Sequence, residues 1–167
     1  MKKLLIVYYS WSNGNTKKIA EELQKVTGGD LARIDTKTAY KEQDYQVVVD
    51  QAEKDVQRGY EPVLAPRFFK VKDYDAIALG TPTWWYTMAP AIKTFLHEED
   101  MKSKLVIPFA THGGWPAHVL ADLKKACPGA QFGPELAVQF DSQGGSTQVT
   151  PQKQVEAWLE QVKTCLA

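Results

Sequence analysis

The feature that most constrains the fold of this chain is a regular alternation between short apolar runs and segments of helical periodicity. Residues 4–8 read Leu-Leu-Ile-Val-Tyr, a continuous run typical of a strand buried on both faces of a parallel sheet. After a polar turn, Ile19, Leu23 and Val26 recur at the i, i+4, i+7 spacing of a helix, which two glycines end. The opening segment therefore predicts a strand followed by a helix.

The same alternation continues to the end of the chain. Further strands are predicted at 31–35, 75–79, 105–109 and 136–140, and further helices at 45–56, 89–96, 117–125 and from 150 onward. In the last helix, Thr150 is the expected N-cap and Pro151 the expected first helical residue. Five strands alternating with five helices predict an α/β fold: a three-layer, doubly wound sandwich whose five-stranded parallel sheet has the order 2-1-3-4-5.

Length and charge narrow the classes of protein that this chain can belong to. Its 167 residues suit one domain spanning 1–167. The 20 basic and 20 acidic residues give no net charge, so no basic face for nucleic acid is expected. The longest aliphatic run, at 4–7, is far too short for membrane insertion. Cys127 and Cys165 form neither a disulfide framework nor a metal-binding spacing, and we expect a cytoplasmic protein with reduced thiols.

The turn at 10–16, Ser-Trp-Ser-Asn-Gly-Asn-Thr, joins the first strand to the first helix. Its hydroxyl and amide side chains, its glycine and the helix N-terminus that follows favour an anion site. The phosphate-loop and dinucleotide patterns are both absent. Because the turn has no Lys or Arg, neutral donors would hold the anion, which favours a phosphate monoester anchored elsewhere by a bulky group. The alternative is an ordinary polar turn in which Ser12 or Asn13 caps the helix.

The loop at 81–87, Thr-Pro-Thr-Trp-Trp-Tyr-Thr, follows the third strand. Three consecutive large aromatic residues cannot all face one core from a loop, so at least one should face solvent or a ligand. A planar ligand stacked on an indole ring would explain them. The alternatives are a loop anchored in the core by its tryptophans and a surface patch for a partner protein.

Two more loops are expected at the same edge of the sheet. Residues 111–115, Thr-His-Gly-Gly-Trp, follow the fourth strand, and the polar, glycine-rich turn 141–146 follows the fifth. In sheets of this kind, ligands bind beyond the carboxyl ends of the strands, where the strand order reverses. Asp141 is the only carboxylate that adjoins these loops, which excludes the acidic cluster of a response-regulator receiver. Together the loops predict a flat heteroaromatic ligand with a phosphate tail.

These segments resemble those of flavodoxin-like proteins, the FMN-binding family, and of its bacterial branch in particular. Residues 83–90 and 108–114 are the most specific matches, the turn 10–16 resembles the family's phosphate loop, and the similarity covers nearly the whole chain. The resemblance implies FMN as the cofactor and no metal. The positions that it implies for FMN binding are Ser10, Ser12, Asn13, Gly14, Asn15 and Thr16 for the phosphate, and Pro82, Thr83, Trp84, Trp85, Tyr86, Thr111, His112, Gly113 and Gly114 for the ring.

Three departures from the family pattern bear on function. The turn 10–16 is one residue longer than the usual pattern and has Asn13 where Thr is usual. The loop 81–87 has no glycine beside Trp84. The chain has no net charge, whereas carriers of the family are acidic. The resemblance implies an electron-transfer carrier that exchanges electrons with redox partner proteins. One alternative is an FMN-dependent NAD(P)H oxidoreductase of the quinone-reductase type, which the neutral charge and the missing glycine favour. Another is a flavin-free binding module. The short chain and the lack of any segment resembling a nicotinamide site favour the carrier.

Overall fold

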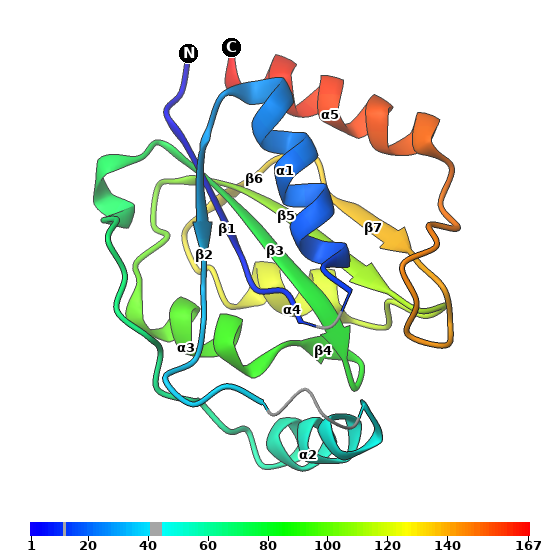
Figure 1. Cartoon of the computed structure of the whole chain (residues 1–167). Helices are drawn as coiled ribbons and strands as arrows, with labels where there is room; N and C mark the ends of the chain where they lie inside the picture. Colours follow the sequence, from blue (N-terminus) through cyan, green and yellow to red (C-terminus); the bar gives the residue numbers. More distant parts are fainter. Residues whose placement is uncertain (12, 41–44) are drawn as a thin grey trace.

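The computed structural model describes residues 1–11, 13–40 and 45–167, and it is built on a parallel sheet. Its main strands are β1 (Leu4–Tyr8), β2 (Asp30–Arg33), β3 (Ala76–Trp84), β5 (Leu105–His112), β6 (Gln131–Phe132) and β7 (Leu136–Gln139). Their order is β2-β1-β3-β5, with β6 and β7 both pairing with the outer side of β5 (Figure 1). The predicted order 2-1-3-4-5 is confirmed, with two short strands sharing the fifth position.

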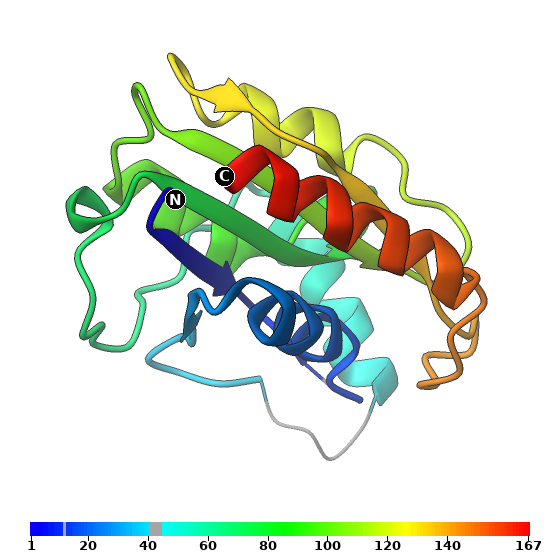
Figure 2. The ribbon, with the colours of Figure 1, turned by 90° about the horizontal axis from the view of Figure 1, so that it is seen from above.

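Two hydrophobic clusters cover the two faces of the sheet. On one face α1 (Asn15–Thr27) and α5 (Gln152–Leu166) pack against strand residues such as Ile6 and Phe109. On the other face α3 (Pro90–Glu98) and α4 (Val119–Lys125) pack against residues such as Val7 and Leu79. Figures 1 and 2 show the sheet between these two layers of helices. Alternate residues of β1 enter opposite clusters, as expected for a strand buried on both sides.

The second helix, α2 (Tyr45–Gln57), covers neither face of the sheet. It lies beyond the carboxyl ends of the strands, next to the tip of β3 (Figure 1). Val48 and Ala52 are buried, but they belong to neither of the two clusters. The apolar face that the sequence predicted for α2 is therefore packed over the loops at the end of the sheet. The sandwich has two helices on each face of the sheet, and α2 lies at its end.

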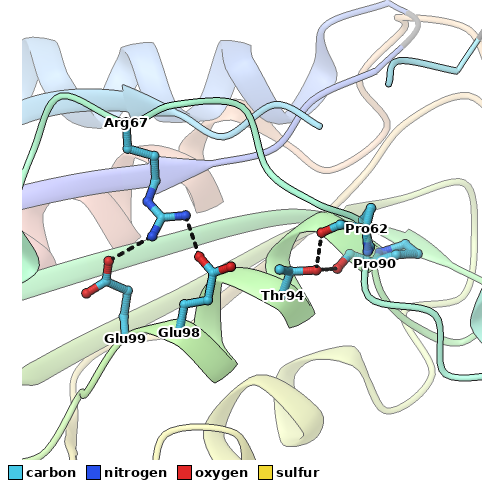
Figure 3. Close-up of polar contacts among 6 residues, drawn as sticks. All are labelled: Pro62, Arg67, Pro90, Thr94, Glu98 and Glu99. Carbon is cyan, nitrogen blue, oxygen red and sulfur yellow. Dashed lines mark hydrogen bonds and ion pairs between the residues drawn. The ribbon is translucent and has the colours of Figure 1, made fainter. Parts of the chain in front are cut away.

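A long connection, residues 58–70, leads from α2 back toward the sheet and is fastened to α3. The hydroxyl of Thr94 donates to the carbonyl of Pro62 at 2.9 Å, and Arg67 forms ion pairs with Glu98 and Glu99 at 2.8 and 3.1 Å (Figure 3). A short 3₁₀ turn (Val71–Asp73) then precedes β3. These contacts hold the connection, and with it the C-terminal end of α2, in a defined place.

Several predicted boundaries differ from the observed ones. The third strand extends to Trp84 and turns back as β4 (Thr87–Met88), an antiparallel hairpin that the sequence did not predict. The prediction that Thr150 caps the last helix and that Pro151 is its first residue is wrong: Pro151 is the N-cap and α5 begins at Gln152. The Thr150 hydroxyl instead accepts a hydrogen bond from the Gln139 N–H at 2.7 Å. Among the described residues, no helix is both long enough and apolar enough to cross a bilayer.

Candidate functional site

A cavity of about 300 Å³ opens at the carboxyl ends of the strands, where the sequence predicted a ligand. It is bounded by the turn before α1, the end of β3, the end of β5, the loop after β7 and one side of α2. Ten of the fifteen predicted site residues line it: Asn13, Asn15, Thr16, Pro82, Thr83, Trp84, Trp85, Thr111, His112 and Gly113. These ten residues come from three separate segments of the chain, which thus meet in one place.

Of the other five predicted residues, the four that the structure describes do not line this cavity. Ser12 lies outside the described residues. Ser10 is buried, and its hydroxyl accepts a hydrogen bond from the Lys17 N–H at 3.3 Å. Gly14 precedes α1 in the left-handed conformation, with φ +72°. Tyr86 is on the outer side of the hairpin, and the Gly114 N–H donates to His112. Three of these residues therefore shape the turns around the cavity.

The turn before α1 has the geometry of an anion site. Gly14 is the N-cap and makes no side-chain cap, the Ser10 hydroxyl takes up the Lys17 N–H, and the first turn of α1 contains no acidic residue. The alternative in which Asn13 caps the helix is wrong, because its amide does not bond to the helix. The backbone N–H groups and the dipole at this helix end favour a negatively charged group. The hydroxyls of Thr16 and Thr111, both buried, hydrogen-bond to each other at 2.8 Å beside it.

The loop after β7 lies directly over this turn. The side-chain amide of Asn13 donates to the carbonyl of Gly144, and that of Asn15 donates to the carbonyl of Gly145 at 3.1 Å. Gly144 has φ +81°, and a Cβ atom there would lie 2.8 Å from the Tyr45 hydroxyl. A glycine is needed at this position both for the backbone conformation and for the close approach of Tyr45. The two asparagines therefore join the turn before α1 to the loop after β7.

The three consecutive aromatic residues occupy three different environments. Trp84 packs edge-on against Tyr9 and Tyr40, with ring centroids 5.5 and 5.3 Å apart. Trp85 turns toward α2, where its indole N–H donates to the carbonyl of Val49 at 3.0 Å. Tyr86 points outward, 48% exposed. The expectation that the three rings cannot share one core holds, and the Trp85 N–H is already used to fix α2.

The α2 helix supplies a wall of the cavity that sequence reasoning missed. Its contribution consists of Tyr45, Val48, Val49 and Ala52. Tyr45 stacks on Trp11, with ring centroids 5.9 Å apart and an interplanar angle of 25°. The other missed lining residues are Trp11, Phe140, Asp141, Ser142 and Gly144. Trp11 belongs to the predicted turn 10–16, and the glycine-rich turn pointed to 141–146, but no signal in the sequence placed α2 here.

The α2 helix is held in place by a buried carboxylate as well. Asp55 is only 2% exposed and accepts hydrogen bonds from the Tyr40 hydroxyl at 2.6 Å and from Arg58 at 2.7 Å. Burial and this hydrogen bond to Asp55 raise the pKa of Tyr40 well above its ordinary value, so its hydroxyl stays a donor. Because Arg58 compensates its charge, the carboxylate is stable inside the protein.

The hairpin that carries these aromatics has an unusual backbone. Thr83 pairs with Met88 and Trp84 with Thr87, which leaves a two-residue turn made of Trp85 (φ +46°) and Tyr86 (φ +74°). Positive φ at both central residues is the type I′ geometry, for which Asn and Gly are the usual residues. Two aromatic residues in this conformation store strain at the rim of the cavity.

Few ionisable side chains line the cavity. Within the described part of the chain, Asp141 is the only acidic residue in its lining, His112 the only histidine, and no Lys or Arg lines it. Burial lowers the pKa of His112. Its Nδ1 accepts a hydrogen bond from the Gly114 N–H at 3.1 Å, so the neutral ring carries its hydrogen on Nε2. This cavity can therefore offer hydrogen-bond donors to an anion without offering a cationic side chain.

Two buried polar atoms of the cavity residues have no hydrogen-bond partner in the described structure: the indole nitrogen of Trp11 and the hydroxyl oxygen of Thr83. Buried polar groups are nearly always hydrogen-bonded, and an unpaired one costs about 1–3 kcal/mol. Two such groups on lining residues of one cavity fit a ligand with polar atoms. An atom of that ligand that meets the Trp11 N–H has to be a hydrogen-bond acceptor.

Comparisons with known proteins agree with this geometry. The family model described as flavodoxin matches residues 3–162, whereas a search of curated proteins found no significant match. Among solved structures, a Bacteroides eggerthii protein assigned as a flavoprotein is 27% identical, with a TM-score of 0.77 over 96% of this chain and 97% of its own.

Two further solved structures are similar to this chain. A flavoprotein from Lactobacillus acidophilus NCFM, solved in complex with FMN, is 27% identical, with a TM-score of 0.69 over 82% of this chain and 93% of its own. A WrbA-like flavodoxin protein from Agrobacterium tumefaciens is 16% identical, with a TM-score of 0.60 over 99% and 98%, and that likeness shows the fold alone. Since the family model spans nearly all of the sequence, the chain belongs to the flavodoxin family.

Proposed function

We propose that this protein binds FMN in the cavity at the carboxyl ends of its strands and acts as an electron-transfer carrier. The observation that carries the proposal is the group of hydrogen-bond donors that line this cavity. The lining combines the N-terminus of α1, whose N-cap Gly14 has no side chain, with the unpartnered polar groups of Trp11 and Thr83 and with aromatic walls. This set fits a phosphate joined to a flat ring that has several acceptor atoms. Family membership and the FMN bound by the Lactobacillus acidophilus relative support the same cofactor.

The residues of the cavity divide into two groups by what they would do. The N-terminus of α1 and the hydroxyl of Thr16 would bind the phosphate, with no cationic side chain involved. Thr83, Trp84 and Tyr45 would contact the ring, and α2 would exclude water from one side of it. When bound, FMN supplies the ability to accept and release electrons singly or in pairs, while the protein supplies orientation and electrostatics.

The lining of the cavity favours the carrier over the NAD(P)H oxidoreductase. A nicotinamide dinucleotide brings a pyrophosphate, which needs cationic side chains or a helix N-terminus. Among the described residues, the lining has no Lys or Arg, and the N-terminus of α1 contributes backbone donors to it. The FMN phosphate would occupy that helix end. We therefore infer that electrons are exchanged with redox partner proteins.

An anaerobic electrochemical titration of the FMN-loaded protein tests the function. A carrier should be reduced in two separate one-electron waves and should oxidise NADH and NADPH only negligibly, with or without a quinone. A single two-electron wave together with steady NAD(P)H-dependent quinone reduction would establish the oxidoreductase instead. Purified protein that takes up no FMN would refute the cofactor assignment itself.

The unpartnered hydroxyl of Thr83 gives a sharper test of the cofactor site. Thr83→Val should weaken FMN binding by roughly tenfold, the value of about one hydrogen bond. The same change should leave the apoprotein as stable as before, or slightly more stable, because it removes a buried group that has no partner. FMN affinity is measured by quenching of flavin fluorescence and stability by urea denaturation.

Thr81→Val is the matched control for this test. The Thr81 hydroxyl is fully buried, donates to the carbonyl of Pro82 at 2.8 Å and accepts from the Ala89 N–H at 3.0 Å. Its removal should destabilise the apoprotein by about 1–2 kcal/mol. If Thr83→Val also destabilises the apoprotein and leaves FMN affinity unchanged, the Thr83 hydroxyl does not face the ligand.

A further inference from the structure

A second cavity, of about 460 Å³, lies on the other side of the β3–β4 hairpin and shares no residue with the first. It is enclosed by the C-terminal part of α2, by α3, by the end of α4 and by β4. Its floor is apolar, formed by Val56, Met88, Pro90 and Ala126. Its volume is within the range of sites for small molecules.

The walls of this cavity are held by specific contacts. The connection after α2 supplies Gly59 and Tyr60, and the Thr94–Pro62 hydrogen bond and the Arg67 ion pairs of Figure 3 fasten that connection to α3. On the opposite side, the Thr87 hydroxyl donates to the carboxylate of Asp122 at 2.6 Å and joins β4 to α4. These contacts hold the walls of the cavity in fixed positions.

Each carboxylate in the walls already has its own partners. Asp55 is paired with Arg58 at 2.7 Å and is hydrogen-bonded to Tyr40. Asp122 accepts from Thr87 and contacts the Nδ1 atom of His118. The charge of Asp55 is thus compensated by Arg58. The carboxylate of Asp122 is hydrogen-bonded to the Thr87 hydroxyl and in contact with His118, with no lysine of the described residues as its partner.

Two lysines of the walls lack such partners. Lys93 on α3 makes one hydrogen bond, to the carbonyl of Gly59 at 3.5 Å, and no ion pair is formed by Lys93 or Lys125 with any described residue. Lys125 ends α4, on the other side of the cavity. Two ammonium groups on different helices, above an apolar floor, form an arrangement that attracts an anion with an apolar body.

We propose that this cavity is a second binding site, specific for a phosphate monoester on an apolar organic body, with Lys93 and Lys125 binding the phosphate and the apolar floor contacting the body. The floor excludes a bare inorganic ion as the preferred ligand, since such an ion would leave Met88 and Val56 uncovered. The site is independent of FMN, because the hairpin separates it from the first cavity.

The probe for this site is adenosine 5′-monophosphate, which joins a phosphate to a planar base, and its neutral counterpart is adenosine. Binding is measured by calorimetry and by amide NMR shifts on protein saturated with FMN, so that the first cavity is occupied. AMP should bind at least about tenfold more tightly than adenosine, with shifts at Thr87 and Ala126, and its affinity should fall as salt rises.

Three single substitutions locate the binding site. Lys93→Met and Lys125→Met should each weaken AMP binding by about threefold to tenfold, and the double variant by more than either. Lys124→Met is the control, because Lys124 is adjacent in sequence but is paired with Glu135 at 2.9 Å and does not line the cavity. Lys93→Arg and Lys125→Arg keep the charge and should retain binding.

Several results would overturn the proposal: no saturable AMP binding at millimolar concentration, equal affinity for adenosine, or equal loss in Lys124→Met. Displacement of AMP by excess FMN would place AMP in the first cavity and would also overturn it. If the protein does not bind FMN at all, the same titration on the apoprotein still decides the second site, since the lysine variants do not touch the first cavity. Failure of the proposed function is thereby distinguishable from failure of this one.

Discussion

The two-residue turn at the tip of the β3–β4 hairpin predicts that Tyr86→Gly is more stable than Tyr86→Ala. At most positions the alanine variant is the more stable of the two. Tyr86 is 48% exposed and has φ +74°. Tyr86→Gly and Tyr86→Ala both remove the ring, which lies 4.9 Å from that of Trp115 and 6.4 Å from that of Trp85. The two variants therefore lose the same ring contacts and differ by one Cβ atom.

The size of the difference follows from two opposing contributions. A Cβ atom in the left-handed region costs about 1–2 kcal/mol, which Tyr86→Gly relieves and Tyr86→Ala does not. Glycine loses more backbone entropy on folding, which costs about 0.5–1 kcal/mol. Tyr86→Gly should therefore be the more stable variant by about 0.5–1 kcal/mol. For a chain of this length, that corresponds to about 1–4 °C in Tm.

Urea denaturation of the apoproteins, with the m-value checked for constancy, measures the difference. Glu156, exposed in the middle of α5, provides the matched pair at an ordinary helical position. There the order should be the usual one, with Glu156→Ala more stable than Glu156→Gly by about 1 kcal/mol. If Tyr86→Ala is as stable as Tyr86→Gly while the control pair behaves normally, the turn is not strained and the reasoning is refuted.

Three further predictions concern the core and the cavity. Gly80→Ala would place a Cβ atom 2.3 Å from Cζ of the fully buried Phe109 ring and should destabilise the protein by about 2 kcal/mol in urea; an unchanged midpoint would mean that the ring has room to move. Thr111→Val leaves the buried Thr16 hydroxyl without its partner at 2.8 Å and should cost about 1–2 kcal/mol, with the double variant Thr16→Val/Thr111→Val less than additive. Because burial lowers the pKa of His112, the unfolded chain binds more protons once the pH falls below the ordinary histidine value of about 6.5. The apoprotein should therefore lose more stability than His112→Gln as the pH falls through that region, and an NMR midpoint for His112 at or above the ordinary value would contradict this.

The strand order could be predicted from the sequence because buried strands joined by right-handed helical crossovers allow few arrangements. A run such as Leu4–Tyr8 is apolar at every position and must be covered on both faces. Between such runs, helical periodicity supplies the crossovers, and their right-handed sense leaves few topologies. The same argument fails for α2. Its periodicity showed that one face is buried, but not which part of the molecule covers Val48 and Ala52.

The hairpin and the last helix boundary were missed for a different reason. Trp85-Tyr86 is not a turn sequence, since type I′ turns normally require residues that tolerate positive φ. Tertiary contacts impose the turn, among them the bond from Trp85 to Val49. Thr150 has the composition of a helix cap, yet its hydroxyl bonds to the Gln139 N–H across the loop. In both places a contact with a distant segment outweighed the local preference.

For the three aromatic residues 84–86, the sequence correctly predicted that the rings cannot share one core, but it did not predict the wall of the cavity that α2 forms. The sequence showed that the rings cannot share one core, and a stacked ligand was one way to separate them. The structure separates them differently: the hairpin sends Trp84 inward, the turn directs the Trp85 N–H to Val49, and Tyr86 is left beside Trp115. Because Trp85 fixes α2, and α2 brings Tyr45 onto Trp11, the strained turn determines the far wall of the cavity. The strained turn and the ligand site are therefore connected, since the Trp85–Val49 hydrogen bond helps to hold α2 against the cavity.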